Sequence, residues 1–220
     1  MKAAPEQQTS DAAYRAVVDE YRALAPRYDT RWARYSELTH QLTAAALPLE
    51  RTGSVLDVAC GTGSMLEQLL RQKPDLHVAG SDISADMLAV AKTRISDDLC
   101  QHTDWRNEAA EHLSYADESF DAVICNNALH FFPDPDKAVT EMRRVLRPGG
   151  CVVLTDWCKD FWTMRAYDVA ARITDSAYQQ MFSSRDISVL LSDSGFTTEQ
   201  VQRCKINWFW GMFTATASKR

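Results

Sequence analysis

The sequence lacks the features that mark membrane, secreted and low-complexity proteins. Its longest apolar runs, such as residues 42–49 and 152–155, are far shorter than the ~20 residues that a helix needs to cross a bilayer. The N-terminal segment MKAAPEQQTSD contains no apolar core of the signal-peptide type. Only 8 glycines and 7 prolines occur in 220 residues, and they form no linker-like stretch. We therefore expect a cytoplasmic protein with no integral membrane segment.

Clustered positive charge is also absent. The chain has 24 Lys and Arg against 30 Asp and Glu, a formal net charge of -6, and no run of basic residues. Binding to nucleic acid depends on clustered cations that displace the counterions of the phosphates. The sequence therefore predicts a small-molecule substrate and no nucleic-acid partner, and it does not indicate an oligomeric state.

The cysteines follow no metal-binding or disulfide pattern. There is no Cys-x-x-Cys pair and no histidine at the spacing of a metal finger. This distribution favours reduced thiols in a cytosol and predicts no metal site. The 6 cysteines are Cys60, Cys100, Cys125, Cys151, Cys158 and Cys204.

The remaining composition, with 45% hydrophobic and 25% charged residues, predicts a single domain over residues 1–220. From Ser10 to about Leu47, apolar residues recur at helical spacing and are interrupted at Pro26. The chain then alternates strand-like and helix-like segments. Expected strands are 54–59, 77–82, 120–125 and 151–156, and expected helices are 64–72, 85–94 and 136–146. This alternation predicts an α/β fold with a doubly wound parallel sheet.

The pattern changes after Asp156. A long amphipathic stretch, 161–182, is expected to pack over the carboxyl edge of the sheet, and a helix is expected at 187–193. Two further strand-like segments, 198–206 and 208–217, are joined so closely that we expect an antiparallel hairpin.

A glycine-rich turn follows the first expected strand in VLDVACGTGSM (55–65). Glycines there allow a tight turn and a close approach of a ligand to the backbone. Asp82 ends the next strand, where a carboxylate accepts both hydroxyls of a ribose. A dinucleotide site normally has a third glycine where Leu66 stands, and Asp57 would repel two phosphates but attract an ammonium. The predicted ligand carries a ribose and a cation.

The motifs resemble those of class I S-adenosylmethionine-dependent methyltransferases, in the group that includes many small-molecule, quinone and lipid methylating enzymes. The resemblance rests on VLDVACGTGSM (55–65), Asp82, DESFDAVICNNALHFFPDP (117–135) and EMRRVLRPGGCVVL (141–154), and it covers about residues 52–157. It implies a Rossmann-like sheet of seven mostly parallel strands with an antiparallel C-terminal hairpin strand. It also implies S-adenosylmethionine as the cofactor, S-adenosylhomocysteine as the product, a helical lid at 1–50, a cofactor-binding core at 52–157 and a substrate side at 158–220.

Carried over to this chain, the resemblance places Asp57 at the methionine ammonium and the backbone of Ala59, Gly61 and Gly63 against the cofactor. Asp82 would bind the ribose hydroxyls. The remaining implied contacts are with the adenine, from Ile83, Met87, the backbone of Ala110 and Glu111, and with the methionine side, from Asn126.

The family usually has an acid near its LPF segment that holds the adenine amino group. Here LSY (113–115) replaces LPF, and Ala109 and Ala110 stand where the pair containing the acid belongs. The acceptor for the amino group is therefore sought among Glu108, Glu111 and Asp104.

Two residues are candidates for catalysis. His130 follows the fourth expected strand, where open α/β sheets bind ligands, so it is either a general base or a packed histidine. Tyr28 lies in a Tyr-Asp pair that resembles the family's N-terminal lid, and its ring either faces the methyl group or covers the sheet.

The motifs are compatible with three alternative functions. The first is methyl transfer to an oxygen, nitrogen or carbon atom of a small molecule. The second is a cofactor-binding partner protein without catalysis. A nicotinamide-dependent oxidoreductase, the third, is disfavoured by Leu66 and by the lack of a Tyr-x-x-x-Lys pair.

Overall fold

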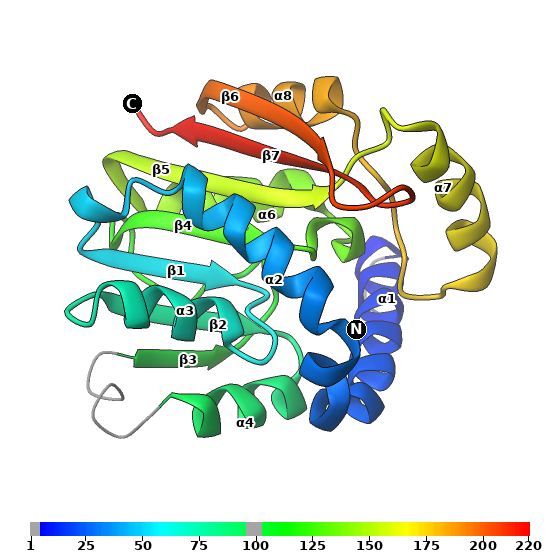
Figure 1. The fold of residues 1–220 in the computed structure, drawn as a ribbon, viewed down its shortest axis with the longest axis horizontal. Helices are drawn as coiled ribbons and strands as arrows, with labels where there is room; N and C mark the ends of the chain where they lie inside the picture. The colour runs from blue at the N-terminus through cyan, green and yellow to red at the C-terminus, as the bar shows by residue number, and fades with distance from the viewer. Residues whose placement is uncertain (1–4, 96–102) are drawn as a thin grey trace.

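The computed structural model describes residues 5–95 and 103–220, with side chains from residue 12 onward. Cys100 lies outside the described residues. The centre of the fold is one seven-stranded sheet in the order β3-β2-β1-β4-β5-β7-β6 (Figure 1). Its strands are β1 (Ser54–Val58), β2 (His77–Asp82), β3 (Thr103–Asn107), β4 (Phe120–Asn126), β5 (Leu146–Trp157), β6 (Thr197–Lys205) and β7 (Gly211–Ser218).

The first five strands pair in parallel, and β7 pairs antiparallel with both β5 and β6. The expected doubly wound sheet with an antiparallel C-terminal hairpin is thus confirmed. The strand order reverses between β1 and β4, which is the position where open α/β sheets bind ligands at their carboxyl edge.

The helices lie on both faces of the sheet. They are α1 (Pro5–Leu24), α2 (Tyr28–Ala46), α3 (Ser64–Gln72), α4 (Ala85–Arg94), α6 (Pro135–Val145), α7 (Trp162–Thr174) and α8 (Ser184–Asp193), with short 3-10 turns at Ala25–Arg27, Leu49–Arg51 and Leu129–Phe131. Apolar residues of α3 pack on one face with Val55 and Val153, and those of α6 and α8 pack on the other with Leu56 and Leu154. Burial on both faces explains the nearly continuous apolar runs of the central strands.

The break at Pro26 is confirmed, because the 3-10 turn at Ala25–Arg27 separates α1 from α2. Figure 1 shows α1 and α7 beyond the carboxyl ends of the central strands, while α2 crosses one face of the sheet. The expectation that the segment after Phe161 packs at this edge is therefore confirmed.

One strand was not expected from the sequence. β3 has the polar sequence TDWRN and lies at the edge of the sheet, where its side chains are only partly buried. An edge strand needs no apolar alternation, so periodicity does not reveal it. Its Trp105 packs on Gly80 of β2, where a Cβ atom would lie 2.6 Å from the indole. The glycine in β2 is thus explained by a residue 25 positions later in the chain.

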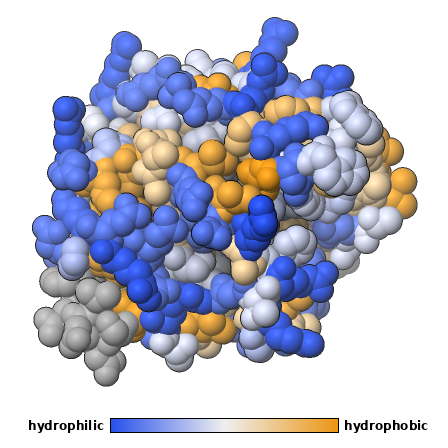
Figure 2. Space-filling view, in the orientation of Figure 1, coloured by the Kyte–Doolittle hydropathy of each residue, from blue (hydrophilic) through white to orange (hydrophobic). Residues whose placement is uncertain are grey.

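The outer face of α7 carries exposed apolar side chains. Figure 2 shows hydrophobic surface at the edge where α7 lies, and Val169 and Ile173 are 63% and 82% exposed. The opposite face of α7, with Met164 and Ala171, is buried. No helix in the described part of the chain combines the length and apolarity that a membrane crossing requires.

Candidate functional site

The loop between β1 and α3 bends through three residues with left-handed backbone angles. Ala59, Gly61 and Gly63 have φ angles of 59°, 54° and 72°. A Cβ atom on Gly61 would meet nothing within 4 Å, so the space beside this residue is open. A Cβ atom on Gly63 would lie 3.0 Å from both Ala91 and Trp105. Gly61 therefore permits a ligand to approach the backbone, whereas Gly63 is required by packing.

Asp82 lies beside this loop at the end of β2. Its Oδ2 atom accepts a hydrogen bond from the Gly61 N–H, and its Oδ1 atom accepts one from the Ser84 N–H, each at 2.8 Å. Burial raises the pKa of Asp82 to about 6, although both N–H donors favour the ionised form. The carboxylate is thus oriented by the backbone, and each oxygen retains lone pairs for a ligand.

Asp57 is buried in β1, close to the same loop. Its Oδ1 atom has no hydrogen-bond partner in the described part of the chain. Burial, and secondly the nearby Asp82 carboxylate, hold the pKa of Asp57 well above its usual range. Two buried carboxylates near each other make this position favourable for a positively charged group.

A pocket opens beside the loop and is called the loop pocket here. Six of the residues expected from the motifs line it: Ala59, Gly61, Asp82, Ile83, Met87 and Asn126. Tyr28 also lines it, together with Tyr14, Val17 and Tyr21 of α1. The spacing of these α1 residues indicated a helix but not its position over this pocket.

Four other expected residues do not line the loop pocket. Asp57 is buried in β1, Gly63 packs against Ala91 and Trp105, and Ala110 is packed in the core. Glu111 accepts a hydrogen bond from the Tyr14 hydroxyl at Oε2 and one from the Asp134 N–H at Oε1, at 3.2 Å. Glu111 therefore ties α1 to the loops at the carboxyl edge.

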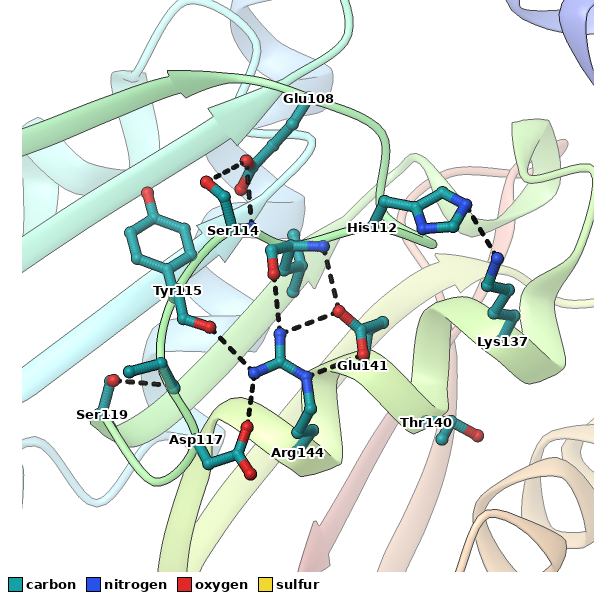
Figure 3. Close-up of polar contacts among 12 residues, drawn as sticks. Glu108, His112, Ser114, Tyr115, Asp117, Ser119, Lys137, Thr140, Glu141 and Arg144 are labelled. Atoms are coloured by element: carbon teal, nitrogen blue, oxygen red, sulfur yellow. Dashed lines mark hydrogen bonds and ion pairs between the residues drawn. The ribbon is translucent and has the colours of Figure 1, made fainter.

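Of the other two acids considered for the adenine, Asp104 pairs with Arg106 at the surface. Glu108 accepts hydrogen bonds from Ser114 at Oε2, and its Oε1 atom is buried without a described partner. Figure 3 shows that this segment is held by Arg144 of α6. The guanidinium donates to the carbonyl oxygens of Leu113 and Tyr115 and pairs with Asp117 and Glu141.

Asn126, at the end of β4, has one satisfied and one unsatisfied side-chain group. Its Oδ1 atom accepts a hydrogen bond from the Thr43 hydroxyl of α2, and its Nδ2 atom is buried without a described partner. This amide leaves a donor at the wall of the loop pocket.

The first turn of α2 is fastened to the glycine loop. Asp29 accepts a hydrogen bond from the Thr62 hydroxyl at 2.7 Å and forms an ion pair with Arg94 of α4. Arg94 also donates to the Thr62 carbonyl at 2.7 Å and pairs with Glu67 at 3.1 Å. This cluster fixes the position of the adjacent Tyr28.

A second pocket, called the aromatic pocket here, adjoins the first. Its aromatic lining consists of Tyr21, Tyr28, Trp32, Tyr35, Phe131, Trp157, Tyr167 and Trp210. Tyr21, Tyr28, Asn127 and Phe131 line both pockets. The space free of protein atoms, openings to solvent included, is about 550 Å³ in the loop pocket and about 740 Å³ in the aromatic pocket.

His130 lines the aromatic pocket and is almost fully buried. Its Nδ1 atom lies 2.7 Å from Oδ1 of Asp156, and its ring stacks on Trp157 at a centroid distance of 3.8 Å. Its Nε2 atom has no partner in the described part of the chain. Asp156 was not identified as a site residue from the sequence. The signal that could have identified it is an acidic residue near the carboxyl end of β5, the strand beside β4.

Tyr28, the other catalytic candidate, forms part of the wall between the two pockets. Burial, followed by the nearby Asp29 carboxylate, raises its pKa to about 12. The phenol is therefore protonated at neutral pH, and it is not a base there. Among the described residues, no group of three or more potential ligands is arranged to hold a metal ion.

Comparison with known proteins gives consistent matches. Residues 56–154 match the family described as "Methyltransferase domain". The demethylmenaquinone methyltransferase of Halalkalibacterium halodurans is 36% identical over 132 residues, which is 58% of this chain and 54% of that protein. The phosphatidylethanolamine N-methyltransferase of Cereibacter sphaeroides is 35% identical over 130 residues, 59% of this chain and 62% of that protein. The chain thus spans roughly half of the length of the curated relatives it matches.

A solved structure shares the whole fold. The 1,6-didemethyltoxoflavin-N1-methyltransferase of Burkholderia thailandensis, with bound 1,6-didemethyltoxoflavin and S-adenosylhomocysteine, aligns with a TM-score of 0.72 at 17% identity. The alignment covers 100% of this chain and 92% of that one.

The loop pocket of this chain fits S-adenosylmethionine on three observations. The side of Gly61 is open, and neither Oδ1 of Asp57, buried close to the glycine loop, nor Nδ2 of Asn126 has a hydrogen-bond partner among the described residues. A cationic amino acid joined to a ribose supplies groups of the right charge and polarity for each. The fold, the domain match over residues 56–154 and these relatives show that the chain is similar to class I S-adenosylmethionine-dependent methyltransferases.

Proposed function

We propose that this protein transfers a methyl group from S-adenosylmethionine to an oxygen, nitrogen or carbon atom of a small molecule. The observation that carries the proposal is the shared wall of the two pockets, formed by Tyr21, Tyr28, Asn127 and Phe131. The loop pocket is lined by Asp82 and has the buried Asp57 close to its glycine loop, and the aromatic pocket has the side chains suited to an organic acceptor. A methyl group at the boundary would be within reach of an acceptor atom.

In this proposal Asp57 holds the methionine ammonium and Asp82 accepts the ribose hydroxyls. Ala59 and Gly61 allow the loop backbone to pass close to the cofactor, and Gly63 contributes by letting the loop pack on Ala91 and Trp105. The remaining contacts are assigned to Ile83, Met87, Ala110 and Glu111 around the adenine and to Asn126 at the methionine side. When bound, the sulfonium supplies an already reactive methyl group, so the protein contributes alignment and exclusion of water.

His130 is assigned the role of general base. The Asp156 carboxylate favours the tautomer with the proton on Nδ1, which leaves the lone pair of Nε2 available to an acceptor proton. Tyr28 is assigned to positioning, because it keeps its proton at neutral pH. Residues 1–50 would then act as a lid over the cofactor-binding core, 52–157, and residues 158–220 would form the substrate side.

The alternative of a partner protein without catalysis is not favoured. The curated relatives are named as methyltransferases, and the dyad of His130 and Asp156 has no evident use in a protein that only binds the cofactor. The relatives' names cover a demethylmenaquinone and a phosphatidylethanolamine acceptor, so similarity alone selects no acceptor atom.

The test is incubation with methyl-labelled S-adenosylmethionine and an extract of the source cells, with label partitioned among lipid, aqueous small-molecule, protein and nucleic-acid fractions. Label in a lipid or aqueous small-molecule fraction supports the proposal. Calorimetry on the same preparation measures the affinity of the loop pocket for S-adenosylhomocysteine separately from methyl transfer.

The substitution Asp82→Ala should weaken that binding at least about tenfold, because it removes a charged acceptor of two hydroxyl groups. Label only in protein or nucleic acid, or no binding at all, would contradict the proposal.

A further inference from the structure

The aromatic pocket contains two carboxylates that methyl transfer does not by itself require. Glu20 of α1 and Asp175, directly after α7, both line it. They are near enough that Asp175, after burial, raises the pKa of Glu20. Arg31 is the one Lys or Arg among the described lining residues, and its guanidinium lies 5.5 Å from the ring centre of Trp32. The lining therefore carries more negative than positive formal charge.

The aromatic rings beside these carboxylates are held in fixed orientations. Trp157 and Trp210 stack at a centroid distance of 5.2 Å, and Tyr167 meets their rings edge-on at 5.2 and 5.3 Å. The indole N–H of Trp157 donates to the Tyr35 hydroxyl at 2.8 Å, and that hydroxyl donates to Asn127 at 2.8 Å. Rigid aromatic faces attract organic cations through the ring quadrupole, and nearby carboxylates add to this attraction.

We propose, as a deepening that rests on the function proposed above, that the acceptor is an organic cation: an amine that is protonated at neutral pH and enters the aromatic pocket between the rings and the carboxylates of Glu20 and Asp175. A neutral planar acceptor would use the rings but would leave Arg31 as the one Lys or Arg among the described lining residues to balance the two carboxylates, one positive charge short. The cationic amine provides the countercharge.

An ammonium group has no lone pair, so its methylation needs a base, and the dyad supplies one. Nε2 of His130 accepts a proton from the ammonium, and Asp156 stabilises the imidazolium. The freed lone pair of the acceptor nitrogen forms a bond to the methyl carbon while the carbon–sulfur bond breaks. The electron pair of that bond stays on sulfur as the neutral thioether of S-adenosylhomocysteine, and His130 releases its proton to water.

The test compares a cation with its uncharged analogue on protein saturated with S-adenosylhomocysteine. The probes are choline and its tert-butyl analogue, in which carbon replaces the nitrogen, and binding is followed by calorimetry and by tryptophan fluorescence. Choline should bind at least about tenfold more tightly than the analogue. In the double variant Glu20→Gln, Asp175→Asn this preference should shrink to about threefold or less. The control is Glu37→Gln, an exposed carboxylate of α2 that lines neither pocket, and it should retain the preference.

Equal affinity for the two probes, no binding of either, or an unchanged preference in the double variant would each overturn the inference. These outcomes are separable from failure of the proposed function. If S-adenosylhomocysteine does not bind, the methyltransferase proposal fails. If it binds and choline is not preferred, only the cationic acceptor is excluded.

Discussion

The Nδ1 atom of His130 lies 2.7 Å from Oδ1 of Asp156, and each side chain is only 3% exposed. The second carboxylate oxygen of Asp156 accepts a hydrogen bond from the backbone N–H of His130 at 3.1 Å. His130 lies four residues after the end of β4, and Asp156 is the second-last residue of β5. These two strands are adjacent, and Asn126 of β4 pairs with Thr155 of β5. The parallel sheet thus brings together an acid and a histidine that are 26 residues apart in sequence.

Asp156→Asn should lower kcat by about 10²- to 10⁴-fold, the usual contribution of general base catalysis. The asparagine amide can donate to Nδ1 and favour the tautomer whose Nε2 carries the proton and is no longer a base. The measurement is the initial rate with the acceptor found by labelling, together with S-adenosylhomocysteine affinity, which should not change.

His130→Ala should give a similar loss of kcat, and the double variant should lose little more, because the two residues act as one unit. A variant with full activity and an unchanged melting temperature would show that His130 is a packed histidine.

The affinity for S-adenosylhomocysteine should rise with pH and level off above about pH 7, because burial raises the pKa of Asp82 to about 6 and the ionised carboxyl is the better hydroxyl acceptor. Calorimetry in buffers of different ionisation enthalpy should detect proton release near pH 6. In Asp82→Ala this proton release should be reduced, and an identical pH profile in both proteins would contradict the assignment.

The same raised pKa predicts the pH dependence of the ligand-free protein. A carboxyl group whose pKa increases from 3.8 to about 6 on folding stabilises the fold below pH 3.8, and this contribution is lost as the pH rises through about 6. The free energy of unfolding of the wild type, relative to Asp82→Ala, should therefore fall by about 2 kcal/mol between about pH 4 and pH 7. Urea unfolding of both proteins at a series of pH values measures this difference in unfolding free energy. If the difference stays constant or increases with pH, the raised pKa of Asp82 is refuted.

Arg94→Met should speed the dissociation of S-adenosylhomocysteine. It removes the ion pair with Asp29 and the hydrogen bond to the Thr62 carbonyl, which fasten α2 to the glycine loop. For partly buried charged contacts we expect a loss of about 1 kcal/mol, or roughly fivefold in affinity. Stopped-flow fluorescence measures the rate.

Arg71→Met is the matched control for Arg94→Met, because Arg71 pairs with the same Glu67 but is 73% exposed and has no described contact with α2. Equal effects of the two substitutions would exclude the fastening role of Arg94.

Alanine at Gly61 and at Gly63 should have different effects. Both residues have positive φ angles, so each substitution should cost about 1 kcal/mol of stability or more. The added methyl group at Gly61 enters open space beside the loop pocket, so it should weaken S-adenosylhomocysteine binding more than Gly63→Ala does. Gly63→Ala should lower the melting temperature further, since its Cβ crowds Ala91 and Trp105. If Gly63→Ala weakened S-adenosylhomocysteine binding more and Gly61→Ala lowered the melting temperature more, the different roles of the two glycines would be contradicted.

The sequence alone was sufficient for the central architecture, for a physical reason. Strands buried on both faces must be apolar throughout, and their helices repeat at 3.6 residues, so the bounds of α3 and α4 were predicted to the residue. The loop of Gly61 and Gly63 was equally visible, because left-handed turns select glycine. The polar edge strand β3 has no such signal and was missed.

What only the tertiary structure decided is which side chains meet across segments distant in the chain. Tyr14 and Tyr21 appear in the sequence as one face of a helix, and nothing local states that this face closes the loop pocket. Asp156 becomes significant only because β5 lies beside β4, and Glu20 and Asp175 line one pocket only because α1 and the end of α7 converge there. Local patterns in sequence specify elements through backbone geometry and burial, whereas a site is formed by contacts between elements, which are fixed only when the sheet and its covering helices have packed.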